Sequence, residues 1–205
     1  MDANHPTKAE AAQYRLFIAL PVPQWVKQEI QLVQTRLRRE LPEGCASWTR
    51  PEQWHLTLKF LGNVDTARVG ALTDAVRVAC ERFTPLRLRA ERVGCFPDLR
   101  KPRVVWVGVH DDENQLAGLA KAVEDAAAGF TAEKRQGGFT GHITVARMKN
   151  FKRPEAGILA GLAREMAERV LGEWTADAVE LMRSELASDG AKHTCLARLP
   201  FEKIA

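Results

Sequence analysis

Two short segments of the chain place a histidine and a threonine in alternation with apolar residues, in the same order. The first is His55-Leu56-Thr57-Leu58 and the second is His142-Ile143-Thr144-Val145. Alternation of this kind is typical of a β-strand with one buried face, because successive side chains leave a strand on opposite sides. The pattern predicts two strands that each turn a histidine and a threonine to one face and apolar residues to the core.

The rest of the chain alternates between strand-like and helix-like patterns. Apolar residues recur at helical spacing in four segments, at about 24–40, 69–79, 116–123 and 154–170. Strand-like runs cover about 15–20, 54–61, 86–91, 104–109, 140–148, 174–185 and 193–199, and a hairpin is expected across 188–190. The order strand, helix, histidine strand, helix, strand therefore occurs twice.

This repeat has a nearly constant offset. His142 follows His55 by 87 positions, and Val104 follows Leu16 by 88. Each copy is too short to bury a good core alone, so two copies are expected to pack together. The sequence predicts a single domain made of two lobes, about 13–100 and 101–205, that exchange strands, after a loose N-terminal tail over 1–12. A pseudo-twofold arrangement would bring both histidine strands to one cleft.

The composition narrows the class of protein. Of 205 residues, 45% are hydrophobic and 27% are charged, and the net charge of +4 permits a polyanionic partner without requiring one. No apolar run approaches the ~20 residues that cross a bilayer, and the N-terminus lacks a signal-peptide core, so no membrane association is expected. Four scattered cysteines favour a reducing, cytoplasmic setting.

Two histidines in one cleft are suited to the hydrolysis of a phosphodiester. The reaction needs a base for water and an acid for the leaving alkoxide, and imidazoles titrate near neutrality, so each can take one role. Thr57 and Thr144 can donate to phosphate oxygens, and a nearby cation can offset the charge that develops there. Strict alternation favours Lys59 as this cation, because it lies four residues after His55, whereas Arg147 lies five after His142.

Other interpretations of the histidines are weaker. A single histidine on a strand is more often structural, but the matched duplication favours a catalytic pair. A zinc site needs three or four ligands, and His5, His110 and His193 stand at no ligand spacing with the pair, so neither a metal nor another cofactor is expected. The sequence also contains no nucleophile elbow and no glycine-rich phosphate loop before a helix.

The two motifs resemble those of the 2H, or two-histidine, phosphoesterases. Flanking segments narrow the resemblance, over about residues 13–200, to the bacterial and archaeal RNA 2′,3′-cyclic phosphodiesterases, also called 2′-5′ RNA ligases. These segments are Arg15–Pro21, His55–Gly62, Phe96-Pro97, Pro102–Val109 and His142–Arg147. The resemblance implies an α+β, bilobal two-histidine phosphoesterase fold, with two pseudo-twofold-related lobes, each an antiparallel sheet flanked by helices, and the active site in the cleft between them.

The resemblance also implies hydrolysis of RNA 2′,3′-cyclic phosphate ends to 2′-phosphates without a metal, and reversible 2′-5′ ligation of RNA. His55 then matches the proton donor to the 3′ oxygen, and His142 matches the base that activates water. Thr57 and Thr144 match the threonines that hold the phosphate, and Arg147 matches an arginine near it. The implied partner is RNA with a 2′,3′-cyclic phosphate end, or a cyclic nucleotide, and the protein is expected to be a monomer.

Some positions and some alternatives stay open at this point. Gly141 stands where the family usually has proline, which frees the backbone before the second histidine, and His193 stands where the family often has an aromatic residue. Trp48, Trp54 and Phe96 are candidates for stacking on a base. The alternative functions are a phosphodiesterase of small cyclic nucleotides or of ADP-ribose cyclic phosphate, and a non-catalytic protein that binds RNA ends, which the intact motifs disfavour.

Overall fold

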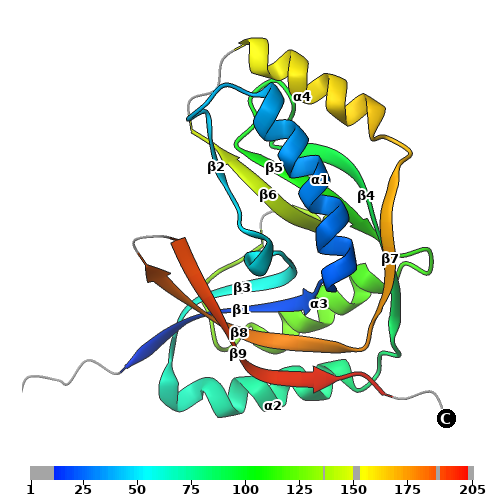
Figure 1. Ribbon diagram of the computed structural model, residues 1–205. Coiled ribbons are helices and arrows are strands. Elements are labelled where there is room, and N and C mark those ends of the chain that lie inside the picture. The colour runs from blue at the N-terminus through cyan, green and yellow to red at the C-terminus, as the bar shows by residue number, and fades with distance from the viewer. Residues whose placement is uncertain (1–11, 136, 150–152, 188–189, 203–205) are drawn as a thin grey trace, which may run out of the picture.

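The computed structural model describes residues 12–135, 137–149, 153–187 and 190–202, and in this part of the chain the strands form two antiparallel sheets (Figure 1). The four-stranded sheet has the order β3-β1-β8-β9, with β1 (Gln13–Pro21), β3 (His55–Asp65), β8 (Ala178–Ala187) and β9 (Gly190–Pro200). The five-stranded sheet has the order β2-β6-β5-β4-β7, with β2 (Ala46–Trp48), β4 (Leu86–Phe96), β5 (Val104–His110), β6 (His142–Met148) and β7 (Val170–Ala176).

Helices cover one face of each sheet. Figure 1 shows α2 (Val69–Cys80) along the four-stranded sheet, where it contacts β9 and α3 (Gln115–Ala127), while α3 contacts β3. The other sheet carries α1 (Gln24–Glu40), which contacts β7, and α4 (Arg153–Glu165), which contacts β4. Each sheet takes strands from both halves of the chain, since β8 and β9 join β1 and β3, whereas β2 and β4 join β5, β6 and β7. The predicted α+β class, with two antiparallel sheets flanked by helices, is confirmed.

Rows of buried apolar side chains between the helices and the four-stranded sheet fix the register of its strands. Leu16, Ile18 and Leu20 of β1 lie beneath the helices with at most 1% of their surface exposed, as does Leu56 of β3. Burial of such a side chain contributes about 1.5–3 kcal/mol. A slip of one residue would turn the whole row outward, so the register that positions the histidines is strongly specified.

The structure corrects several predicted boundaries. The single strand expected over 174–185 is two strands in different sheets, because the chain leaves the five-stranded sheet at Ala176 and enters the other at Ala178. The helix expected to reach about 170 ends at Glu165. The short strand β2 was not predicted, because three residues carry too little alternation. The tip of the expected hairpin (188–189) and residues 1–11 of the expected tail lie outside the described residues. None of the described helices combines the length and apolarity needed to cross a bilayer.

Candidate active site

The two predicted histidines begin equivalent strands of different sheets. His55 is the first residue of β3 and His142 is the first residue of β6, and these two strands contact each other. The imidazoles are within electrostatic reach, since a charge on His142 contributes to the lowered pKa of His55. Thr57 and Thr144 follow two residues later on the same faces and are half-buried.

Both rings are held by the same hydrogen bond. Nδ1 of His55 donates to the carbonyl oxygen of Gln53 over 2.6 Å, and Nδ1 of His142 donates to that of Thr140 over 2.8 Å. A carbonyl oxygen can only accept, so Nδ1 carries the proton in both rings. Each Nε2 is therefore the atom that can accept or release a proton.

Burial disfavours the charged form of both histidines. It lowers the pKa of His55 to about 4, with a smaller contribution from the neighbouring His193. It also lowers the pKa of His142, where the positive charge of Arg147 adds to the effect. Both imidazoles are therefore neutral at neutral pH in the ligand-free protein, and the charge of a bound anion would favour protonation.

Aromatic rings pack against both histidines. Phe17 stacks on His55 with ring centroids 4.6 Å apart, and His193 of β9 meets the same ring edge-on at 5.3 Å. Phe96 meets His142 edge-on at 4.9 Å. His193, one of the two positions where the sequence departs from the pattern it resembles, thus contacts the first histidine directly.

A β-bulge at the last residue of each motif reverses the alternation of the side chains that follow. The pairing of β1 with β3 skips Leu58, and the pairing of β5 with β6 skips Val145. One extra residue turns the side chains that follow to the opposite face. Lys59 therefore faces the helices, whereas Phe60 and Arg147, each five residues after its histidine, face the cleft.

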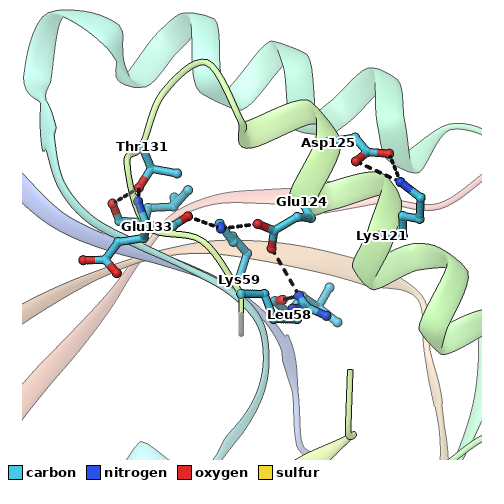
Figure 2. Close-up of polar contacts among 9 residues, drawn as sticks. Leu58, Lys59, Lys121, Glu124, Asp125, Thr131 and Glu133 are labelled. Atoms are coloured by element: carbon cyan, nitrogen blue, oxygen red, sulfur yellow. Dashed lines mark hydrogen bonds and ion pairs between the residues drawn. The ribbon is translucent and has the colours of Figure 1, made fainter. Parts of the chain in front are cut away.

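The bulge removes the simple alternation that linked Lys59 to His55, yet Lys59 still borders the same cavity as Thr57 and His142. Its ammonium group has protein partners. Lys59 is 4% exposed, and its Nζ donates to a carboxylate oxygen of Glu124 and to the carbonyl oxygen of Glu133, each over 2.5 Å. Figure 2 shows Lys59 between these two residues, which belong to α3 and to the segment that follows it. Its part in phosphate binding stays a prediction, but the observed contacts attach this segment to β3.

Arg147 lies where strict alternation did not place it. It is exposed on the cleft face of β6 and close enough to His142 to affect the pKa of that imidazole. Its part in phosphate binding stays a prediction. A cluster of three or more metal-ligating side chains does not occur in this part of the chain.

A cavity of about 400 Å³ opens beside the two motifs. Thr57 and His142 border it on one side, together with Phe60, whose side chain is 55% exposed. The segment before β6 borders it on the other side, and there the guanidinium of Arg135 lies 4.9 Å from the ring centroid of Phe139. The lining also includes Glu124 and Glu133, whose carboxylates balance part of the positive charge of Lys59, Lys134 and Arg135. The aromatic rings beside the histidines suit stacking on the base of a nucleotide.

The aromatic residues proposed from the sequence have different environments. Phe96 borders the cavity. Trp54 is 2% exposed in the core, and Trp48 on β2 packs beneath the guanidinium of Arg38, 5.1 Å from the ring centroid. Sequence reasoning missed Phe60, because its exposure to the cleft depends on the bulge.

The close packing around position 141 leaves no room for a side chain, so the structure requires Gly141. A Cβ atom there would lie 2.4 Å from the carbonyl oxygen of Val109 and 3.1 Å from Cδ2 of Leu116. The carbonyl oxygen of Gly141 accepts a hydrogen bond of 2.9 Å from the amide of Val109. This close approach of two backbones holds the entry to β6, so glycine does not loosen the histidine that follows.

Comparisons with known proteins agree with this geometry. A family model described as LigT like Phosphoesterase matches residues 20–106. The chain is 30% identical over 173 residues to an RNA 2′,3′-cyclic phosphodiesterase of Aquifex aeolicus, covering 83% of this chain and 90% of that protein. It is 31% identical over 178 residues to the protein of the same name from Archaeoglobus fulgidus, covering 86% and 94%.

Solved structures share the fold. A protein of Thermus thermophilus superimposes with a TM-score of 0.72 at 25% identity, over 91% of this chain and 97% of that one. The Escherichia coli LigT complexed with 3′-AMP gives a TM-score of 0.71 at 23% identity, over 93% and 99%. The second likeness concerns the fold alone.

Proposed function

Because the chain belongs to the RNA 2′,3′-cyclic phosphodiesterase family of LigT-like phosphoesterases, we propose that it hydrolyses RNA 2′,3′-cyclic phosphate ends to 2′-phosphates. The catalytic pair is His55 and His142, and no metal takes part. The observation that carries this proposal is the matched orientation of two imidazoles from different sheets, each with Nδ1 bound to a carbonyl and Nε2 left for proton transfer.

The two histidines take opposite roles in one displacement. Nε2 of neutral His142 accepts a proton from water as the water oxygen bonds to phosphorus. The bond from phosphorus to the 3′ oxygen breaks, and Nε2 of protonated His55 gives its proton to that oxygen. The negative charge of the bound diester raises the pKa of His55, which burial otherwise holds at about 4, so the acid form is created by substrate binding.

Phosphate binding falls to groups on the cleft face. The hydroxyls of Thr57 and Thr144 donate to the non-bridging oxygens, and the guanidinium of Arg147 offsets the charge that grows on them. Lys59 contributes only indirectly, because its ammonium group is bound to Glu124 and Glu133.

The cavity beside His142 has room for more than water. Its volume of about 400 Å³ and its bordering Phe60 and Phe139 suit a nucleoside. If the 5′-hydroxyl of an RNA end replaces water, the same proton transfers join it to phosphorus and yield a 2′-5′ linkage. We therefore include reversible 2′-5′ ligation in the proposal.

One chain suffices for the reaction, since it carries both histidines, and we propose that it acts as a monomer. Its cysteines are free, with Cys45, Cys80 and Cys95 buried and Cys195 exposed. Free thiols suit a reducing compartment, which supports action in the cytoplasm.

The test uses purified protein treated with EDTA and a short RNA that ends in a 2′,3′-cyclic phosphate. The product is identified by mass and by chromatography that separates 2′- from 3′-phosphates. His55→Ala and His142→Ala should each reduce turnover by about 10²- to 10⁴-fold, the usual contribution of a general acid or base. The matched control is His110→Ala, whose side chain is 48% exposed at the end of β5 and which should leave turnover unchanged.

Other outcomes identify the alternatives. Full turnover in both active-site variants would contradict the mechanism, and a 3′-phosphate product would exchange the roles of the two histidines. Preference for a mononucleotide over the oligonucleotide would indicate a phosphodiesterase of small cyclic nucleotides or of ADP-ribose cyclic phosphate. Binding without turnover, with affinity that falls as salt rises, would indicate a protein that only holds RNA ends.

A further inference from the structure

Gln34 is a buried polar side chain of α1 that reaches the strand of the second histidine. It is 4% exposed, and its Nε2 donates to the carbonyl oxygen of Val145 over 2.8 Å and to that of Thr49 over 2.7 Å. The amide of Thr49 donates to the same Val145 oxygen over 3.1 Å. Because a buried amide is unfavourable without partners, this side chain constrains the backbone that it binds.

Val145 is the extra residue of the bulge in β6. The bulge is in the pairing with β5, while the carbonyl oxygen of Val145 points to the β2 side, where it accepts from both the amide of Thr49 and the side chain of Gln34. Gln34 thus adds a second hydrogen bond that fixes the position of the bulged residue. The equivalent bulge in β3 shows the same arrangement, since the carbonyl oxygen of Leu58 accepts from the guanidinium of Arg135. In each half of the molecule, a side chain from a distant segment therefore binds the carbonyl of the bulge.

The bulge decides where Arg147 points. With the extra residue, Ala146 is buried and Arg147 is exposed on the face of His142 and Thr144. Without it, alternation would turn the guanidinium toward α1 and the core, where its charge would be desolvated.

We propose that Gln34 is a positioning residue, which holds the bulge at Val145 and thereby keeps Arg147 on the cleft face beside His142. Its effect on catalysis rests on the proposed function, whereas its effect on the position of Arg147 does not. The residue acts through Arg147 and touches neither histidine.

The kinetic test is a double-mutant cycle. Gln34→Met keeps the length of the side chain and removes both donated hydrogen bonds. Arg147→Gln should reduce kcat/KM by about 10- to 100-fold, as expected for a lost charge-assisted hydrogen bond, and Gln34→Met by about tenfold. The double variant should lie within about twofold of Arg147→Gln alone, because independent effects would multiply whereas effects through one group do not.

A second readout does not depend on activity. NMR titration of the His142 imidazole reports the nearby charge of Arg147, which lowers the pKa of His142. Among the described residues, the other charged or titratable groups around it are His55 of β3 and the residues that border the same cavity, Lys59, Glu124, Glu133, Lys134 and Arg135. Gln34→Met should move the His142 midpoint upward, toward its value in Arg147→Gln. Gln34→Asn is the second variant, because its amide is one methylene too short to reach Val145.

The control is Val33→Ala, at the preceding position of α1 and also 4% exposed. It removes core packing without removing a hydrogen bond to β6, so it should leave the His142 midpoint and kcat/KM unchanged. A folded Gln34 variant with a wild-type midpoint, or with a kinetic effect that multiplies that of Arg147→Gln, would overturn the proposal. If the wild-type protein does not turn over cyclic-phosphate RNA, the proposed function fails and the titration still decides this inference.

Discussion

Replacement of Lys59 by methionine separates a stabilising role of its ammonium group from a role in phosphate binding. Lys59 is 4% exposed, and its partner Glu124 is 28% exposed. Breaking a fully buried ion pair costs about 3–5 kcal/mol. Glu124 keeps some contact with water and with Arg135, 3.5 Å away, so we expect a smaller loss of about 2–3 kcal/mol in the free energy of unfolding.

The assay is thermal and urea unfolding followed by circular dichroism, together with KM for cyclic-phosphate RNA. For a chain of this length each kcal/mol shifts Tm by roughly 2–4 °C, so a shift of about 4–12 °C is expected. Lys59→Met/Glu124→Met should recover part of the loss, because it removes the unpaired carboxylate, although Arg135 then loses its ion pair with Glu124. Lys121→Met is the control, since Lys121 is 76% exposed and forms a surface pair with Asp125 on the same helix (Figure 2).

The control should change the free energy of unfolding by less than about 0.5 kcal/mol. The reasoning would be refuted if Lys59→Met matched the control in stability while its KM rose tenfold. In that case the ammonium would contact phosphate, and its bonds to Glu124 and Glu133 would not matter for the fold.

Three further changes test other parts of the site. Gly141→Ala brings a Cβ within 2.4 Å of the Val109 carbonyl oxygen, so urea unfolding should show a loss of about 1–3 kcal/mol. The folded-state pKa of His55, about 4, is below the usual value of about 6.5. The unfolded chain therefore binds more protons between these values, so the free energy of unfolding decreases as the pH is lowered from about 6.5 to about 4. Tm measured over this window should fall less steeply in His55→Gln than in the wild-type protein, and an identical slope would contradict the burial of a neutral ring. Phe60→Ala should raise KM for a nucleoside 2′,3′-cyclic phosphate about 5- to 100-fold if the ring stacks on the base, and should leave KM for a baseless cyclic phosphate unchanged.

The repeated order of elements is visible in the sequence because apolar periodicity reports which face of an element is buried. The change of sheet near Asp177 is invisible for the same reason. Trp174, Ala176 and Ala178 are buried at even positions, and Val179 and Leu181 at odd ones. The half-buried pattern therefore continues across the break with only a change of phase at 178–179, which a bulge would produce equally well. The two strands are distinguished only by their partners, since β7 pairs with β4 and β8 pairs with β1.

The catalytic candidates could be predicted because they precede the bulges. His55 and His142 start their strands, and two residues of strict alternation are enough to place a threonine beside each. The residues after the bulges could not be placed, since one extra residue exchanges the faces of Lys59 and Phe60 without any signal in composition. The groups that bind the bulge carbonyls, Gln34 and Arg135, come from segments far away in the chain.

The same bulge in both halves yields two unlike residues at equivalent positions, and this difference bears on the roles of the histidines. Five residues after His55 the cleft receives Phe60, and five after His142 it receives Arg147. Burial is the main cause of the low pKa of His55, with smaller contributions from His193 and from the positive charge of Lys27. A bound anion offsets desolvation strongly in a site of low dielectric. The charge of Arg147 stays beside His142 after the anion binds and continues to oppose protonation of that ring. Substrate binding should therefore raise the pKa of His55 more than that of His142, which supports the proposed roles of the first histidine as the acid and the second as the base.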